Sequence, residues 1–185
     1  MSAQKILVAG LPESGKTTFL AALWHLVSIR ELKTELQFET LVGCDATHLN
    51  KIAGFWRDAV VQTRTSSATY TDVLLRLKSE TKGPVSVQFP DLSGEEYRDL
   101  WERRAYYERF GEYLTETNRV LLFIHADKLN KPRWIFDEAF VRQTLSVQDS
   151  QPTPVSWSPK LAPTQVQLVD LLQLLVRGAL DVGPR

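Results

Sequence analysis

The chain has 185 residues, of which 43% are hydrophobic and 24% charged, so it is too apolar for an intrinsically disordered protein and long enough for one domain with a core. Its 22 basic and 22 acidic side chains give a formal net charge of zero, which argues against a nucleic-acid-binding protein. A single cysteine, Cys44, excludes an intrachain disulfide. No apolar run approaches the roughly 18 residues of a membrane span, and no secretory signal follows Met1. We therefore expect a cytoplasmic protein with no membrane span and no nucleic-acid partner.

The first predicted elements are a strand, a glycine-containing loop and a helix. Residues 5–10 form an apolar run that stops at a glycine, as in a strand buried on both faces. A turn-rich loop covers residues 10–15, and apolar residues recur at helical spacing from 16 to 30. Residues 31–39 are polar and favour no single structure, whereas 47–62 carry the apolar stripe of a second helix.

The remaining predicted elements are less regular. An exposed loop rich in Thr and Ser covers 63–71, and two strands follow at 71–77 and 85–89. A charged helical stretch covers 95–117, and a buried strand covers 119–124. A long irregular segment rich in proline covers 125–163, and a last helix covers 164–180. The order strand, loop, helix at the start of the chain is the part that bears on function.

Residues 10–17 read GLPESGKT and match the phosphate-binding pattern G-x-x-x-x-G-K-[ST]. Glycines allow backbone N–H groups to curl around phosphate oxygens, and the helix that follows adds its N-terminal donors and positive dipole end. Lys16 offers a charge to the outer phosphates, and the Thr17 hydroxyl is a hard oxygen ligand for Mg²⁺. The predicted nucleotide-binding residues here are Gly10, Glu13, Ser14, Gly15, Lys16, Thr17 and Thr18.

A second candidate element follows a predicted strand, where residues 85–94 read VSVQFPDLSG. Asp91 at the end of this strand could hold Mg²⁺ directly or through water, and the N–H of Gly94 could meet the terminal phosphate. An Asp-x-x-Gly sequence alone is weak evidence, because both residues are common in turns. Downstream of a phosphate-binding loop it supports a nucleotide site with Thr17 and Asp91 as metal ligands.

Together, these motifs over residues 5–124 resemble the first half of a Ras-like GTPase of the translation-factor-related class. The run from 11 to 24 further resembles the bacterial double-GTPase-type proteins of conflict systems. The resemblance implies an α/β fold, a P-loop NTPase three-layer sandwich with a mostly parallel sheet, and a helical insertion at about 31–62 before switch I. It also implies Mg²⁺ and GTP as ligands and a molecular switch as the function.

The chain departs from this family at two places. Glu95 follows Gly94, where Ras-like enzymes usually carry a glutamine that orients the attacking water; a carboxylate cannot donate a hydrogen bond to phosphate, so slow hydrolysis is expected. The second departure is that no [NT]-K-x-D motif for guanine follows residue 124, and His125-Ala126-Asp127-Lys128 has its Asp and Lys in the wrong order. We interpret 1–185 as a single, truncated domain, or as a domain completed by a partner chain.

The leading functional hypothesis is a Mg²⁺-dependent nucleoside-triphosphate switch that hydrolyses the γ-phosphate, with Lys16 and Glu95 at the reaction and with Thr65 or Thr69 as the switch threonine. Arg64, which follows the predicted insertion, could act in cis as a catalytic arginine. The alternatives are an ATPase with the same phosphate site and a catalytically weak P-loop interaction module. A protein effector or the missing C-terminal half would be the partner.

Other polar and aromatic residues carry weaker signals. His25 lies among apolar neighbours in the first helix and is expected to be packed there, and the pair Cys44 and His48 lacks the further ligands of a metal site. Three tryptophans are expected to be core or interface residues (Trp56, Trp101 and Trp134).

Overall fold

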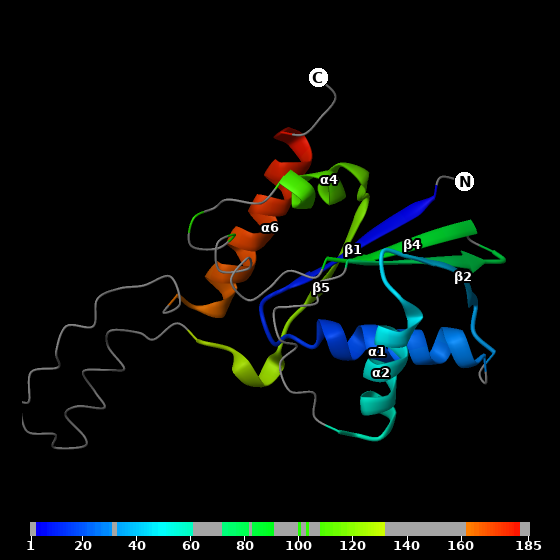
Figure 1. The fold of residues 1–185 in the computed structure, drawn as a ribbon. Coiled ribbons are helices and arrows are strands. Elements are labelled where there is room, and N and C mark those ends of the chain that lie inside the picture. The colour runs from blue at the N-terminus through cyan, green and yellow to red at the C-terminus, as the bar shows by residue number, and fades with distance from the viewer. Residues whose placement is uncertain are drawn as a thin grey trace, which may run out of the picture.

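The computed structural model describes residues 3–30, 33–60, 72–81, 83–90, 100, 103, 108–131 and 162–181. Within these residues the chain alternates strands and helices, as Figure 1 shows. In chain order the elements are β1 (Gln4–Gly10), α1 (Lys16–Ile29), β2 (Leu36–Val42), α2 (Ala46–Arg57), β3 (Val73–Ser79), β4 (Gly83–Phe89), α4 (Glu108–Glu116), β5 (Arg119–Phe123), the short 3₁₀ helix η1 (Ala126–Lys128) and α6 (Thr164–Asp181).

The strands form one mixed sheet in the order β2-β3-β4-β1-β5. β1 is parallel to both β4 and β5, whereas β3 is antiparallel to both β2 and β4. All strands except β3 therefore run in one direction, and the carboxyl ends of β4, β1 and β5 lie at the same edge. This arrangement confirms the expected α/β fold with a mostly parallel sheet.

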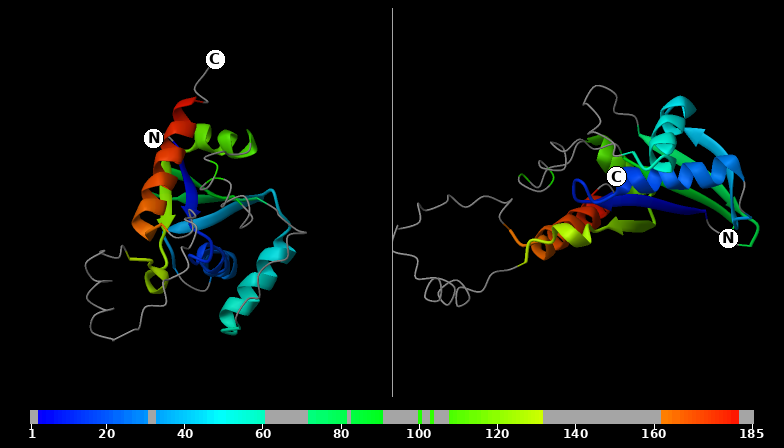
Figure 2. Two further views of the ribbon diagram at one scale, coloured as in Figure 1. Left: turned by 90° about the vertical axis from the view of Figure 1, so that its left-hand side faces the viewer. Right: turned by 90° about the horizontal axis from the view of Figure 1, so that it is seen from below.

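Helices cover both faces of the sheet, so the molecule has three layers (Figures 1 and 2). Successive residues of β1 point to opposite faces, as the pleat of a strand requires. Val8 joins the core beneath α1 and α2, and Leu7 and Ala9 join the core beneath α4 and α6. β1 is thus buried on both faces, and its end lies at the carboxyl edge of the sheet between the ends of β4 and β5.

The expected helical insertion at 31–62 is helical only in its second part. Residues Leu36–Val42 form β2, which pairs with β3 in antiparallel register at one edge of the sheet, and α2 follows it. Leu36, Phe38 and Leu41 pack against the core while polar residues between them face outward. A register shift between Phe38 and Thr40 interrupts the alternation, which is why the sequence pattern did not reveal a strand here.

The expectation of a buried strand at 119–124 is wrong in its burial. β5 forms as expected, but it is the last strand of the sheet in the described part of the chain, and Val120 and Leu121 are exposed. Of the charged helix expected at 95–117, the structure describes α4, which lies near the C-terminal end of that range. The expected last helix is confirmed as α6. Most of the proline-rich segment, 132–161, lies outside the described residues.

Candidate functional site

The phosphate-binding loop begins where β1 meets β5. Gly10 is the register partner of Phe123, and a Cβ on Gly10 would lie 2.5 Å from the Phe123 carbonyl oxygen and 2.8 Å from Ser14 Oγ. A side chain at this position would therefore push the loop away from β5. The close approach of the loop to its neighbouring strand explains why the motif begins with glycine here.

At its other end the loop leads into α1 through Gly15. This residue has φ of 95°, and an added Cβ would meet none of the described residues within 4 Å. Within the described residues no side chain caps α1, whereas α2 is capped by Asp45, whose Oδ1 accepts a hydrogen bond from the Thr47 N–H at 3.0 Å. The positive dipole end of α1 thus lies at the loop, where it would favour an anion.

Lys16, the first residue of α1, folds back across the loop. Its Nζ donates hydrogen bonds to the carbonyl oxygens of Gly10 at 2.8 Å and Leu11 at 2.9 Å, and it lies 3.5 Å from Ser14 Oγ. Burial lowers the pKa of Lys16 from 10.5 to about 8, because a partly desolvated ammonium is less stable than a solvated one. A phosphate oxygen at this place would receive a charge-assisted hydrogen bond from Nζ.

Glu13, in the middle of the loop, forms an ion pair with Lys128 of η1, a residue that the sequence analysis did not assign to the site. The pair is possible because β5 is parallel to β1 and ends beside it, which brings η1 next to the loop. Glu13 also has a left-handed backbone, with φ of 62°. A lysine four residues beyond the predicted strand 119–124 was the signal in the sequence, and only the pairing of β1 with β5 makes it meaningful.

The remaining predicted residues divide into two groups. Thr17 and Thr18 lie exposed in the first turn of α1, and Ser14 is buried in the loop. A threonine hydroxyl here suits Mg²⁺, which prefers hard oxygen ligands and shares them with phosphate. The other predicted site residues lie outside the described residues, namely Arg64, Thr65, Thr69, Asp91, Gly94 and Glu95.

One residue expected to be structural, His25, lies packed in the structure. His25 packs against Trp56 with ring centroids 5.4 Å apart, as expected for a packed histidine. In the described part of the chain, no three His, Cys, Asp or Glu side chains form a group that could hold a metal ion. No helix among the described residues combines the length and apolar character needed to cross a bilayer.

The comparison with protein families gives one match. The chain is similar to the family described as Double-GTPase 1 over residues 7–184. No curated protein and no solved structure matches it. The match reaches well beyond residue 124, where the motifs that suggested a GTPase end, and includes the last helix, α6.

Proposed function

The chain belongs to the Double-GTPase 1 family, which indicates GTPase-like nucleotide binding, and from this membership we propose that it is a Mg²⁺-dependent switch that hydrolyses the γ-phosphate of GTP slowly. The observation that carries the proposal is the loop between β1 and α1. Lys16 Nζ donates hydrogen bonds to the loop carbonyls of Gly10 and Leu11, and the loop leads through Gly15 into the N-terminus of α1. These are the parts that hold a triphosphate in a P-loop enzyme.

In this proposal each residue of the loop has a separate task. Gly15 and the first-turn amides of α1 bind phosphate oxygens, and Lys16 neutralises charge that grows on the transferring phosphoryl group. Thr17 and Asp91 would hold Mg²⁺, whose chemical contribution is to polarise the β- and γ-phosphate oxygens. β4 ends at Phe89, two positions before Asp91 in the sequence, and its carboxyl end lies beside that of β1, which supports this assignment.

Slow hydrolysis follows from the residue after Gly94. Glu95 can accept a hydrogen bond from the attacking water, but it cannot donate one to the phosphate, and its charge opposes a second anion nearby. Arg64 would offset this defect if it reached the γ-phosphate, because a catalytic arginine is worth about 10³ to 10⁵ in rate. Thr65 or Thr69 and Gly94 would change position on hydrolysis and report the nucleotide state to a protein effector.

The test separates phosphate binding from metal binding. Lys16→Ala should abolish binding of Mg²⁺-GTP in calorimetry while the protein still unfolds cooperatively, because Lys16 contacts the loop and not the core. Asp91→Ala should weaken binding with Mg²⁺ present but not with EDTA, since only an ion ligand is lost. Unchanged GTP affinity in Lys16→Ala would contradict the proposal, and equal losses with and without Mg²⁺ would make Asp91 a structural residue.

The same experiments decide between this proposal and its alternatives. Tight ATP binding with phosphate release, and weak GTP binding, would identify an ATPase with the same phosphate site. Tight nucleotide binding without phosphate release from the longest natural form of the chain would identify an interaction module. For Arg64, single-turnover hydrolysis by Arg64→Lys should fall at least about tenfold with little change in affinity, because lysine lacks the planar fork of arginine.

A further inference from the structure

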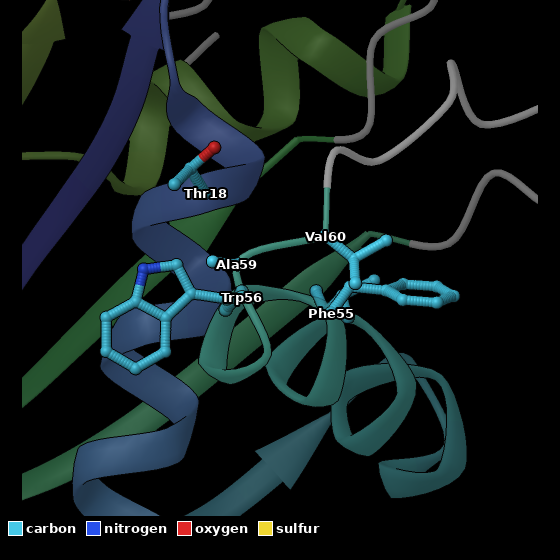
Figure 3. A pocket seen from close by; sticks show the side chains of 7 residues that line it. Thr18, Phe55, Trp56, Ala59 and Val60 are labelled. Atoms are coloured by element: carbon cyan, nitrogen blue, oxygen red, sulfur yellow. The ribbon is translucent and has the colours of Figure 1, made fainter.

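We propose that an apolar pocket between α1 and α2 receives the nucleoside of the bound nucleotide and holds the base by stacking, with little discrimination between bases. The proposal rests on the proposed function, because it needs a triphosphate on the adjacent loop. The pocket has a volume of about 360 Å³ and is shown in Figure 3. It is lined by Thr18, Ala21, Ile52, Phe55, Trp56, Ala59 and Val60.

The pocket begins where the phosphate site ends. Its lining includes Thr18, which is in the first turn of α1 directly after Thr17, and Ala21, one turn further along the same helix. A nucleotide whose phosphates lie on the loop and on the start of α1 has to carry its nucleoside past this first turn. The opposite wall is the end of α2, so the pocket lies between the two helices beside the first turn of α1 (Figure 3).

The chemistry of the lining fits a flat aromatic ligand. Among the lining side chains, only the Thr18 hydroxyl and the Trp56 indole N–H are polar. Trp56 is 39% exposed and Val60 is 52% exposed, which is a high exposure for two large apolar side chains on one rim. An apolar patch beside a hollow of this size is typical of a ligand site.

The Trp56 ring is already oriented in the described structure. It contacts His25 of α1 with the ring planes at 54°. The position of α2 is itself fixed, because Trp24 Nε1 donates a hydrogen bond to Asn50 Oδ1 at 2.8 Å and Leu49 is completely buried. A preoriented aromatic ring loses less freedom on binding, and every nucleobase offers a π-face for stacking.

Weak discrimination between bases follows from the same lining. A site rejects the wrong base strongly when its buried polar groups are left unpaired by that base. This pocket provides two polar side-chain groups and otherwise apolar contact, so guanine and adenine should bind with similar affinity. The pocket thus supplies a place for the base in a chain whose sequence contains no guanine-reading [NT]-K-x-D motif.

The experiment compares nucleotides with inorganic triphosphate, which has no base. Affinities for Mg²⁺-GTP, Mg²⁺-ATP and Mg²⁺-triphosphate are measured by calorimetry for the parent, Trp56→Ala, Trp56→Phe and Lys16→Ala. Trp56→Ala should weaken both nucleotides about tenfold, the usual scale of a lost stacking contact, and leave inorganic triphosphate unchanged. Trp56→Phe should keep most of the affinity. Ile29→Ala, an exposed apolar residue at the far end of α1, is the matched control and should change nothing.

Each other outcome has a definite meaning. Unchanged nucleotide affinity in Trp56→Ala, or an equal loss for inorganic triphosphate, would overturn the pocket proposal while leaving the phosphate site intact. A parent protein that binds neither nucleotide nor triphosphate would overturn the proposed function as well. Photolabelling of the parent with 8-azido-GTP and 8-azido-ATP is independent of any variant and should mark the end of α2. Labelling elsewhere, or a guanine preference of a hundredfold or more, would also contradict the proposal.

Discussion

The ammonium group of Lys16 is partly buried, and its hydrogen bonds to the carbonyl oxygens of Gly10 and Leu11 do not compensate for the hydration that it loses. Burial lowers its pKa to about 8, whereas a solvated lysine titrates at 10.5. Between these values the unfolded chain binds more protons than the folded chain at this residue. This group therefore makes the free energy of unfolding rise with pH across that window, and below it the folded protein carries the full cost of the buried charge.

The first prediction uses this pKa. A bound triphosphate stabilises the charged form of Lys16, so binding near and above pH 8 should be accompanied by uptake of a proton, and affinity should fall as the pH rises through 8 to 9.5. Calorimetry in buffers with different ionisation enthalpies measures both quantities. Lys16→Arg is the control, because a guanidinium stays protonated throughout. A pH-independent affinity in the parent would mean that Lys16 does not contact the phosphates.

A second prediction concerns the charge of Glu13, which lies within a loop that has to bind an anion. Lys128 provides a counter-charge, so Lys128→Ala should weaken binding of Mg²⁺-triphosphate about two- to fivefold, the scale of an exposed ion pair. Glu13→Gln in the same protein should restore the affinity. Lys5→Ala breaks an exposed ion pair with Glu116 near the other end of β1 and should have no effect. Failure of Glu13→Gln to restore binding would show that Lys128 acts in some other way.

α2 is the helix that packs against α1 beside the candidate nucleotide site. Its start is fixed by the Asp45 cap, and the hydrogen bonds from the Thr47 amide and side chain lower the pKa of Asp45. The cap thus contributes stability above the usual pKa of an aspartate, and this contribution is lost as the pH falls through the lowered value. The inner face of α2 is held in the core beneath α1 by Leu49, Ile52 and Ala53.

The third prediction tests this attachment. Leu49 is fully buried, so Leu49→Ala leaves a cavity under α2 and should lower the free energy of unfolding by about 2 to 4 kcal/mol, measured by urea denaturation. Lys51→Ala on the exposed side of the same helix is the control and should change stability little. If the pocket between α1 and α2 holds the base, Leu49→Ala should also weaken nucleotide binding more than triphosphate binding. A stability loss below about 1 kcal/mol would show that the site collapses around the smaller side chain.

On the scale of the whole molecule, the two edges of the sheet differ. β2 carries polar residues such as Gln37 and Glu39 on its outer face, which protect an edge strand from pairing with another chain. β5 instead exposes Val120 and Leu121, and Ile124 follows them with 52% exposure. In the described part of the chain nothing pairs with the outer side of β5. This edge is where a strand of a partner chain would continue the sheet.

The fourth prediction follows from this open edge. The 185-residue chain should associate at high concentration through β5, and Leu121→Lys should prevent association, because a charge on an edge strand disfavours further strand pairing. Light scattering after size exclusion measures the oligomeric state of both proteins. Ile29→Lys, at an exposed apolar position on α1, is the matched control and should leave association unchanged. A parent chain that stays monomeric at millimolar concentration would contradict this expectation.

The sequence by itself determined the features that depend on neighbouring residues. The strand, loop and helix around GLPESGKT form a contiguous pattern, and the structure confirms them as β1, the loop and α1. The strands predicted at 71–77 and 85–89 form with shifted bounds as β3 (Val73–Ser79) and β4 (Gly83–Phe89), and one face of each is buried. β2 was not predicted, since its alternation is broken by a register shift with β3, which depends on pairing with a distant strand.

Only the tertiary structure decided which distant residues surround the loop. Lys128 and Glu13 are 115 positions apart, and they meet because β5 pairs in parallel with β1. Trp56 and Thr18 line one pocket because α2 packs on α1, a contact that no local pattern encodes. The exposure of β5 also depends on its place at the end of the sheet and not on its composition, which is that of a buried strand. Local chemistry thus identified the phosphate loop, whereas the order of strands and the packing of helices set what surrounds it.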